Sequence, residues 1–243
     1  MKVMEVFKTI QGEGLFSGCP TTFIRFAGCT LACRGCDTVP SWKSKNSLQI
    51  NGRDVAEVAP SAIIDRVIEI DPLPRHICIT GGEPLEQDNR QLAELIVNLI
   101  EKYPLLKIVL ETGGHASLTR LGHWIRQIYH YPHRIEERLC YSVDFKTPST
   151  GREDRMILEN FFFLTHKDII KFVCSDEADF QWCVQRLKAL QQKNVMTNVF
   201  FHTMGGKADK WLANLICNSD WSWAVSHFDI RFGVQLHKLL GMA

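Results

Sequence analysis

Three cysteines, Cys29, Cys33 and Cys36, fall within eight residues of a 243-residue chain. Exposed free thiols are a liability, so three this close together indicate a shared metal centre. Structural zinc takes four ligands in a closed tetrahedron, and Cys19 could supply the fourth. An iron–sulfur cube held by three cysteines keeps one iron open for a substrate or cofactor. The spacing therefore favours an iron–sulfur cluster, with zinc as the alternative.

The remaining cysteines indicate packing rather than chemistry. Disulfides are rare in cytosolic proteins, and free cysteine is among the most buried residue types. Cys19 stands in a turn between a glycine and a proline. We expect core positions for the five that stand singly in apolar segments: Cys78, Cys140, Cys174, Cys183 and Cys217.

The composition predicts an ordinary globular protein. The chain has 45% hydrophobic and 23% charged residues, which argues against disorder, collagen and a disulfide miniprotein. It has no apolar run near the ~18 residues of a membrane span and no signal-peptide core, so we expect a cytoplasmic protein. With 28 Lys+Arg against 27 Asp+Glu, the charge balance gives no overall field to attract nucleic acid or a membrane.

Short apolar runs alternate with helical patterns along the chain, which predicts βα units and a mostly parallel sheet. We expect strands at 22–26, 77–80, 107–110, 139–145, 168–173, 195–201 and 228–232. We expect helices at 61–70, 91–102, 118–128, 179–191 and 207–217.

The chain length narrows the architecture. A closed eight-unit barrel takes ~250 residues. Here an N-terminal hairpin (1–20), the cysteine loop (29–38) and a polar insert near 42–54 use much of the first 58 residues. We therefore expect one α/β domain over 1–243, a partial parallel βα barrel of about six strands that ends in a strand and tail at 228–243. An open doubly wound sheet is the alternative, and both folds place chemistry at the carboxyl ends of the strands.

The cysteine spacing also carries a resemblance. C-x3-C-x2-C after the first expected barrel strand is similar to the signature of the radical S-adenosylmethionine superfamily. Gly81-Gly82-Glu83-Pro84, after the next strand, resembles the GGEP element of that superfamily, which hydrogen-bonds the methionine amino group. The resemblance implies a 4Fe–4S cluster whose open iron binds S-adenosylmethionine, and a deoxyadenosyl radical formed on reduction.

A closer resemblance covers nearly the whole chain. Its elements are IQGEG at 10–14, FIRFAGC at 23–29, CDT at 36–38, TGGEP at 80–84, DFKTPS at 144–149, KFV at 171–173 and QLHK at 235–238. Together they resemble the 7-carboxy-7-deazaguanine synthase family of 7-deazapurine (queuosine) biosynthesis. The resemblance implies conversion of 6-carboxy-5,6,7,8-tetrahydropterin to 7-carboxy-7-deazaguanine. The radical takes hydrogen from C6, the ring contracts and ammonia is lost.

The resemblance also implies roles for individual residues, with no protein nucleophile among them. Cys29, Cys33 and Cys36 would hold the cluster, and Thr38 would bind Mg²⁺. Substrate contacts would come from Ile10, Gln11, Gly12, Glu13, Arg25 and Thr80. S-adenosylmethionine contacts would come from Gly35, Cys36, Asp37, Gly82, Glu83, Asp144, Phe145, Lys146, Lys171, Phe172, Val173 and Cys174.

The chemistry of several of these residues suits the role that the resemblance implies. Arg25 can bind a carboxylate through two parallel hydrogen bonds, which lysine cannot do. The amide of Gln11 and the carboxylate of Glu13 suit the donor and acceptor edges of a pterin. A hydroxyl such as that of Thr38 suits Mg²⁺, although a threonine here could equally cap a helix.

The chain departs from the family pattern at three places. Asp144-Phe145 stands where many relatives have Ser-Pro, Gly113 replaces an asparagine, and the chain ends in Ala243 rather than proline. The resemblance further implies a homodimer and an electron donor such as a flavodoxin or ferredoxin. Four histidines show no ligand spacing, and we expect them on the surface or on helices: His115, His123, His130 and His133.

Two alternative functions stay open at this point. A radical activase that places a glycyl radical on a partner protein would leave Arg25 and the 11–14 loop without a pterin to bind. A zinc-stabilised module could bind RNA through the basic stretch at 130–138. The near-neutral charge disfavours the RNA binder, because such domains usually have a pI above ~9 or a basic stripe.

Overall fold

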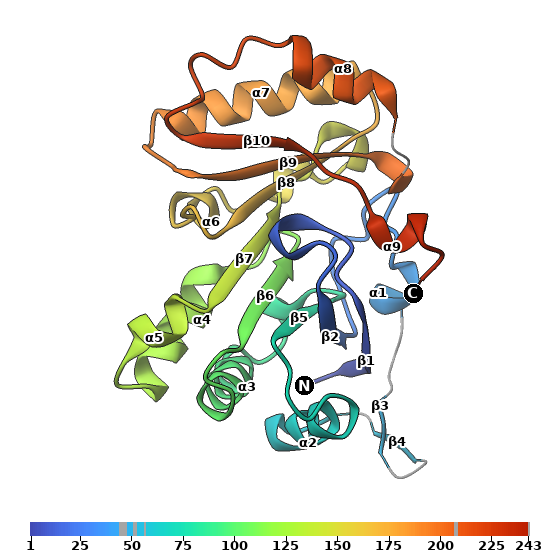
Figure 1. Ribbon diagram of the computed structural model, residues 1–243, viewed down its shortest axis with the longest axis vertical. Helices are drawn as coiled ribbons and strands as arrows, with labels where there is room; N and C mark the ends of the chain where they lie inside the picture. The colour runs from blue at the N-terminus through green and yellow to red at the C-terminus, as the bar shows by residue number, and fades with distance from the viewer. Residues whose placement is uncertain (44–47, 51–52, 56, 207–208, 243) are drawn as a thin grey trace.

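A computed structural model describes residues 1–43, 48–50, 53–55, 57–206 and 209–242. Its main sheet has eight strands in the order β1-β2-β5-β6-β7-β8-β9-β10. β1 is antiparallel to β2, and every other neighbouring pair is parallel (Figure 1). The bounds are β1 Val3–Ile10, β2 Pro20–Phe26, β5 His76–Gly81, β6 Lys107–Thr112, β7 Leu139–Asp144, β8 Ile169–Cys174, β9 Thr197–Thr203 and β10 Phe228–Phe232.

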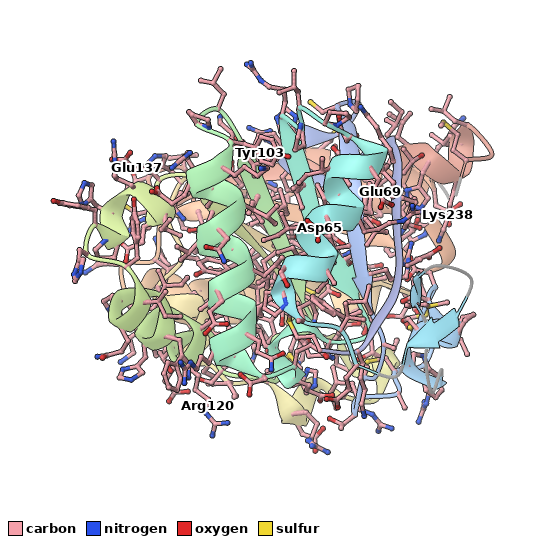
Figure 2. The ribbon with its side chains drawn as sticks, turned by 90° about the horizontal axis from the view of Figure 1, so that it is seen from below. Asp65, Glu69, Tyr103, Arg120, Glu137 and Lys238 are labelled. Atoms are coloured by element: carbon pink, nitrogen blue, oxygen red, sulfur yellow. The ribbon has the colours of Figure 1, made fainter. Side chains whose placement is uncertain are left out.

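Helices α2 to α8 lie between strands in the chain and cover one face of the sheet, whereas α1 and α9 carry residues that line a cavity on the other face. Figure 2 shows α2 and α3 side by side in front of the strands, with Asp65 and Glu69 labelled on α2. The helices are α1 Val39–Lys43, α2 Pro60–Ile70, α3 Asn89–Lys102, α4 Leu118–Ile128, α5 Pro132–Glu136, α6 Glu159–Phe162, α7 Glu177–Gln191, α8 Lys210–Asn218 and α9 Leu236–Leu239.

Alternation along the strands separates the core from the inner face of the sheet. In β8, Ile170 and Phe172 are fully buried in the core, whereas Lys171 lines a cavity on the opposite face. In β7, Val143 lies in the core and Asp144 lines the same cavity. Because successive side chains of a strand point to opposite faces, one face packs on the helices and the other can carry polar groups.

The expected partial barrel is confirmed. β1 and β10 are the two edges of the sheet and do not pair with each other, so the barrel stays open. Six strands, β5 to β10, follow residue 58 as expected, and the hairpin strands β1 and β2 complete the eight. The doubly wound alternative is wrong, because helices α2 to α8 contribute to the core on one face of the sheet and the other face carries the cavity.

Two helices begin two residues earlier than their apolar patterns indicated. α3 begins at Asn89 rather than at position 91, because the Asp88 carboxylate accepts the amide hydrogens of Arg90 and Gln91. α7 begins at Glu177 rather than at 179, because the Asp176 carboxylate accepts the Asp179 amide hydrogen. Such caps satisfy amides that have no partner within the helix.

Two predicted segments lie partly outside the described residues. The insert near 42–54 contains the short antiparallel pair β3 Leu48–Ile50 and β4 Arg53–Val55, while 44–47 and 51–52 lie outside the described residues. Residues 207 and 208 of the last expected helix also lie outside them. No helix among the described residues is long and apolar enough to cross a membrane.

The prediction of five buried cysteines is confirmed for four and wrong for Cys217. Cys78, Cys140, Cys174 and Cys183 are buried, whereas Cys217 is exposed on α8. The buried residue of α8 is Leu212. At 3.6 residues per turn, Cys217 lies about 140° around the helix from it and therefore faces solvent.

Candidate active site

A cavity of about 230 Å³ opens at the carboxyl edge of the sheet, lined by the strand ends and the loops that follow them. It brings together residues that are far apart in the sequence, as expected where parallel strands end at one edge. Every predicted site residue except Gly12, Phe172 and Cys174 lines it.

The three exceptions pack against other parts of the protein instead of facing the cavity. The side chains of Phe172 and Cys174 are fully buried in the core, because they alternate with Lys171 and Val173 along β8. They could contact a cofactor only through the main chain. Gly12 packs against His237, since a Cβ atom at Gly12 would lie 1.9 Å from His237 Nδ1.

The cysteine loop runs from the end of β2 to α1, and residues of another segment hydrogen-bond to its main chain. The Arg152 guanidinium donates to the Leu31 carbonyl and, at 3.4 Å, to the Ala32 carbonyl. The Arg34 amide donates to the Thr150 carbonyl at 3.1 Å. These contacts tie the loop to the segment that follows β7.

The thiols of this loop suit a cluster better than a single ion. Cys29, Cys33 and Cys36 all line the cavity. In the described part of the chain, no three His, Cys, Asp or Glu side chains converge as ligands of one metal ion. Zinc requires such convergence, whereas the cysteines of an iron–sulfur cube each bind a different iron. Cys19, the proposed fourth zinc ligand, lies in the hairpin turn outside the cavity lining.

Two thiols of the cysteine loop, those of Cys29 and Cys33, keep their protons at neutral pH because their pKa is raised. Burial, with the Glu83 and Glu86 carboxylates adding to it, raises the pKa of Cys29 to about 11. Burial also raises the pKa of Cys33. Because metals bind thiolates, cluster assembly must release these protons.

Gly81 and Gly82 allow β5 to approach the cysteine loop closely. The Gly82 amide donates to the Phe26 carbonyl at 2.8 Å, and the Glu83 amide donates to the Gly28 carbonyl at 2.7 Å. A Cβ atom at Gly82 would lie 2.0 Å from the Gly28 carbonyl oxygen. Gly81 has a φ of +121°, which favours glycine. The Gly-Gly pair is therefore a packing requirement as well as a motif.

We expect Gly82→Ala to lower the free energy of unfolding by about 2 kcal/mol or more, because one of two main chains must move. Chemical denaturation of the apoprotein measures this. Gly122→Ala is the matched control: Gly122 is on α4, and the side-chain atoms nearest to its Cβ position belong to Arg126, at 3.5 Å. That control should be neutral or stabilised by up to about 1 kcal/mol. Equal stability of the two variants would contradict the packing requirement.

Glu83 connects the ends of β5 and β6. Its carboxylate accepts the Thr112 hydroxyl at 2.7 Å and the amides of Gly113 and Leu85 at 2.8 and 3.0 Å. Burial raises its pKa despite these donors. The motif indicated a cofactor contact, and the structure adds that this carboxylate fixes the two strand ends.

His115 lies beside Glu83, contrary to the prediction of a surface or helix position. Its side chain is only 5% exposed, in the loop after β6, with Nε2 2.8 Å from Glu86 Oε1. No periodic pattern in the sequence marks this burial. The available clue was the place of His115 just after β6, at the edge of the sheet where Glu83 and Glu86 follow β5.

A buried ionic group occupies the floor of the cavity. Lys171 Nζ lies 2.8 Å from Glu13 Oε2 and 3.4 Å from Asp144 Oδ1, and Lys146 pairs with the other oxygen of Asp144. Burial alone would raise the pKa of Glu13, but the Lys171 ammonium outweighs it and brings that pKa well below its usual range. Burial would also raise the pKa of Asp144, but the Lys146 ammonium, followed by that of Lys171, outweighs burial and lowers this pKa. These groups therefore stay charged and mutually oriented.

Glu111 lies next to this group and was missed as a site residue. The Thr80 hydroxyl donates to its Oε2 at 2.9 Å, and the Gln11 amide donates to its Oε1 at 3.3 Å. Burial raises the pKa of Glu111. Two predicted substrate residues are thus oriented by one buried carboxyl group.

His202 is a second missed residue, at the end of β9. It is 4% exposed, and it lines the cavity. Burial lowers its pKa to about 4, although Glu13 acts in the opposite direction. His202 is therefore neutral at physiological pH and can offer one donor and one acceptor nitrogen.

We expect the free energy of unfolding to fall as the pH drops from 6.5 toward 4. The unfolded chain binds a proton on His202 below 6.5, while the folded chain does not until about 4. The full loss is about 3 kcal/mol. Denaturation between pH 6.5 and 5 should show a shallower slope in His202→Gln, and the exposed His133→Gln should keep the wild-type slope. Identical slopes in both variants would contradict this assignment.

Aromatic rings and Arg25 form one wall of the cavity. The Phe7 and Phe23 rings stack at 5.2 Å with an interplanar angle of 13°, and the Arg25 guanidinium lies 5.3 Å from the Phe7 centroid. Glu5 accepts from Arg25 Nε at 2.7 Å. This contact leaves the terminal nitrogens able to face a ligand carboxylate. The two phenylalanines are ordinary strand residues by sequence, so their role was missed.

The C-terminal segment covers the cysteine loop, with α9 next to α1 in Figure 1. The Gln235 amide donates to Asp37 Oδ2 at 3.0 Å and to Glu13. Lys238 Nζ lies 3.6 Å from the same Asp37 oxygen. The QLHK element thereby connects the loop that contains Glu13 with the cysteine loop that contains Asp37.

Comparison with known proteins agrees with this site. Residues 10–127 match a family described as a 4Fe-4S single cluster domain. A 7-carboxy-7-deazaguanine synthase from Methanospirillum hungatei is 32% identical, with 100% of this chain and 86% of the relative covered. The chain belongs to the 7-carboxy-7-deazaguanine synthase family. The synthase of Clostridium acetobutylicum is 29% identical over 98% of this chain and 95% of its own length.

The fold comparison points the same way. The crystal structure of QueE from Escherichia coli superposes with a TM-score of 0.68, at 21% identity, covering 97% of this chain and 93% of that one. At this identity the likeness concerns the fold. Family membership confirms the resemblance stated from the sequence and makes the chain a radical S-adenosylmethionine enzyme with an iron–sulfur cluster. The zinc module is not supported.

Proposed function

We propose that this protein converts 6-carboxy-5,6,7,8-tetrahydropterin to 7-carboxy-7-deazaguanine with loss of ammonia. The supporting observation is that three cysteine thiols, Arg25 and a stacked aromatic wall line one cavity. A pterin is flat and carries a carboxylate, which fits rings and a guanidinium. Family membership supports the same activity.

The chain's residues would bind and orient this substrate. Arg25 would hold the carboxylate, since Glu5 already fixes its Nε edge. Gln11 and Thr80 are held by Glu111 and would meet the polar edges of the ring. Such fixed geometry is what positioning catalysis requires. The C-terminal segment over the loops would keep water out.

Cys29, Cys33 and Cys36 would hold the 4Fe–4S cluster. When bound, the cluster and S-adenosylmethionine supply the radical that starts the reaction. The cofactor's charged methionine group would meet the lining of Glu83, Asp144 and Lys146. Phe172 and Cys174, predicted as contacts, could take part only through main-chain atoms.

We further propose Mg²⁺ as a cofactor, bound by Thr38. The Thr38 hydroxyl lines the cavity and lies 3.7 Å from Cys36 Sγ. One hydroxyl with substrate oxygens and waters is a reasonable set for this hard cation. An electron donor such as a flavodoxin or ferredoxin, a homodimer and a cytoplasmic location are also part of the proposal.

The test is turnover of the carboxytetrahydropterin by anaerobically reconstituted protein with S-adenosylmethionine and a chemical reductant, with and without Mg²⁺. We expect 7-carboxy-7-deazaguanine, ammonia and stimulation by Mg²⁺. A protein that cleaves the cofactor but does not convert the pterin would refute the proposed reaction and favour the activase. Full activity without Mg²⁺ would refute only the metal assignment.

A further inference from the structure

Glu86 lies against the main chain beside the first cysteine of the loop. It ends the 3-10 turn η2, Pro84–Glu86, that follows the Gly-Gly pair. Its Oε1 and Oε2 accept the Thr30 amide hydrogen at 3.2 and 3.1 Å, and its Oε1 also accepts the Thr30 hydroxyl. Thr30 directly follows Cys29, so this carboxylate fixes the main chain at that cysteine.

His115 holds Glu86 in place. Its Nε2 lies 2.8 Å from Glu86 Oε1, and its Nδ1 lies 3.5 Å from Glu83 Oε2. Glu83 in turn accepts from Thr112 at the end of β6. His115 therefore lies between Glu83, at the end of a central strand pair, and Glu86, which hydrogen-bonds the residue next to Cys29.

We propose that Glu86 and His115 form a positioning pair that holds Cys29 ready for the cluster and keeps the cluster's reduction potential low. Hydrogen bonds to the sulfurs and nearby net charge both set that potential. The amides of Leu31 and Ala32 donate to the Cys29 sulfur, whereas the Thr30 amide is held by Glu86. The Glu86 carboxylate places negative charge near the cluster, and this charge disfavours the cluster's gain of an electron, so the reduced cluster is a stronger reductant.

The proposal adds two residues to those that support the cluster. It rests on the proposed cysteine ligands and does not depend on the identity of the substrate. Removing a partner of this kind typically lowers metal affinity by about 10- to 100-fold. The pair makes no contact with the groups proposed to bind the pterin, so its effects should be seen on the cluster itself.

The test uses the full chain, reconstituted anaerobically. Glu86→Ala should lose iron to a chelator about 10- to 100-fold faster than wild type. Glu86→Gln, which removes the charge at nearly the same size, should have a more positive midpoint potential in a titration followed by electron paramagnetic resonance. His115→Leu, which keeps the Glu86 charge but removes its support, should also release iron faster than wild type. Glu69→Gln is the control, since Glu69 is exposed on α2 and pairs there with Arg66 (Figure 2).

Wild-type iron release in Glu86→Ala and His115→Leu, or a wild-type potential in Glu86→Gln, would overturn the proposal. If these variants fail to fold, amide hydrogen exchange of the wild-type apoprotein decides. The Thr30 amide should exchange more slowly than in an unstructured chain, and exchange at the unstructured rate would overturn the positioning contact. Wild-type protein that takes up no iron would instead refute the cluster ligands.

Discussion

An alanine at Cys29, Cys33 or Cys36 is expected to leave the reconstituted protein without a stable cluster and without turnover. Each thiolate binds a different iron, so no neighbouring cysteine can replace a missing one. The described residues place no other cysteine in the cavity lining. Iron and sulfide content, with the visible absorption of the cluster, measures the loss directly, and the activity should fall below detection.

Two other cysteines provide matched controls for this result. Cys217→Ala removes an exposed thiol on α8, and Cys19→Ala removes the candidate fourth zinc ligand in the hairpin turn. Both variants should keep wild-type iron content. Iron lost in Cys19→Ala would require a fourth protein ligand, and iron retained in Cys33→Ala would remove that cysteine from the ligand set.

Arg25→Ala is expected to lower kcat/KM for the pterin by about 100- to 1,000-fold while the cluster stays bound. Truncating one partner of a hydrogen-bonded charge pair in a desolvated site costs about 2–5 kcal/mol. The Arg25 side chain is 18% exposed and is held by Glu5 on one edge, so its geometry is fixed before substrate arrives. Steady-state kinetics with the pterin, together with iron content, separates the two effects.

Arg25→Lys tests the geometry rather than the charge. Lysine keeps the positive charge but cannot form two parallel hydrogen bonds to a carboxylate, so most of the activity should stay lost. Cleavage of S-adenosylmethionine without the pterin should continue in both variants, because Arg25 is not among the proposed cofactor contacts. Full rescue by lysine would reduce its role to simple charge attraction, and unchanged pterin kinetics in Arg25→Ala would refute its role.

The cavity also distinguishes the proposed reaction from the activase. An enzyme that acts on a partner protein must admit a segment of polypeptide, whereas here Gln235 and Lys238 cover the cysteine loop through Asp37. The aromatic wall and Arg25 would have no use in that reaction. The structure thus favours a small flat substrate.

The sequence by itself determined the fold class and most of the site. Short apolar runs at 77–80 and 168–173 predicted the strands β5 and β8, because such runs are typical of buried strands in a parallel sheet. The order of strands and helices then placed Cys29, Thr80 and Asp144 at one edge, since parallel strands end together. These inferences depend only on the local pattern and the order of the elements, and both can be obtained from one amino-acid sequence.

The tertiary structure alone decided which side chains contact one another. Glu111, His202 and Phe7 entered the site because the sheet curves around the cavity, and no local periodicity marks residues on its inner face. Cys217 faces solvent because α8 buries the side that carries Leu212, and His115 is buried beside Glu83 and Glu86, which are distant in the chain. The pairing of Lys171 with Glu13, 158 positions away, and of Glu86 with Thr30 fixes the electrostatics of the site. Electrostatic energy depends on distance in space, which sequence separation does not provide.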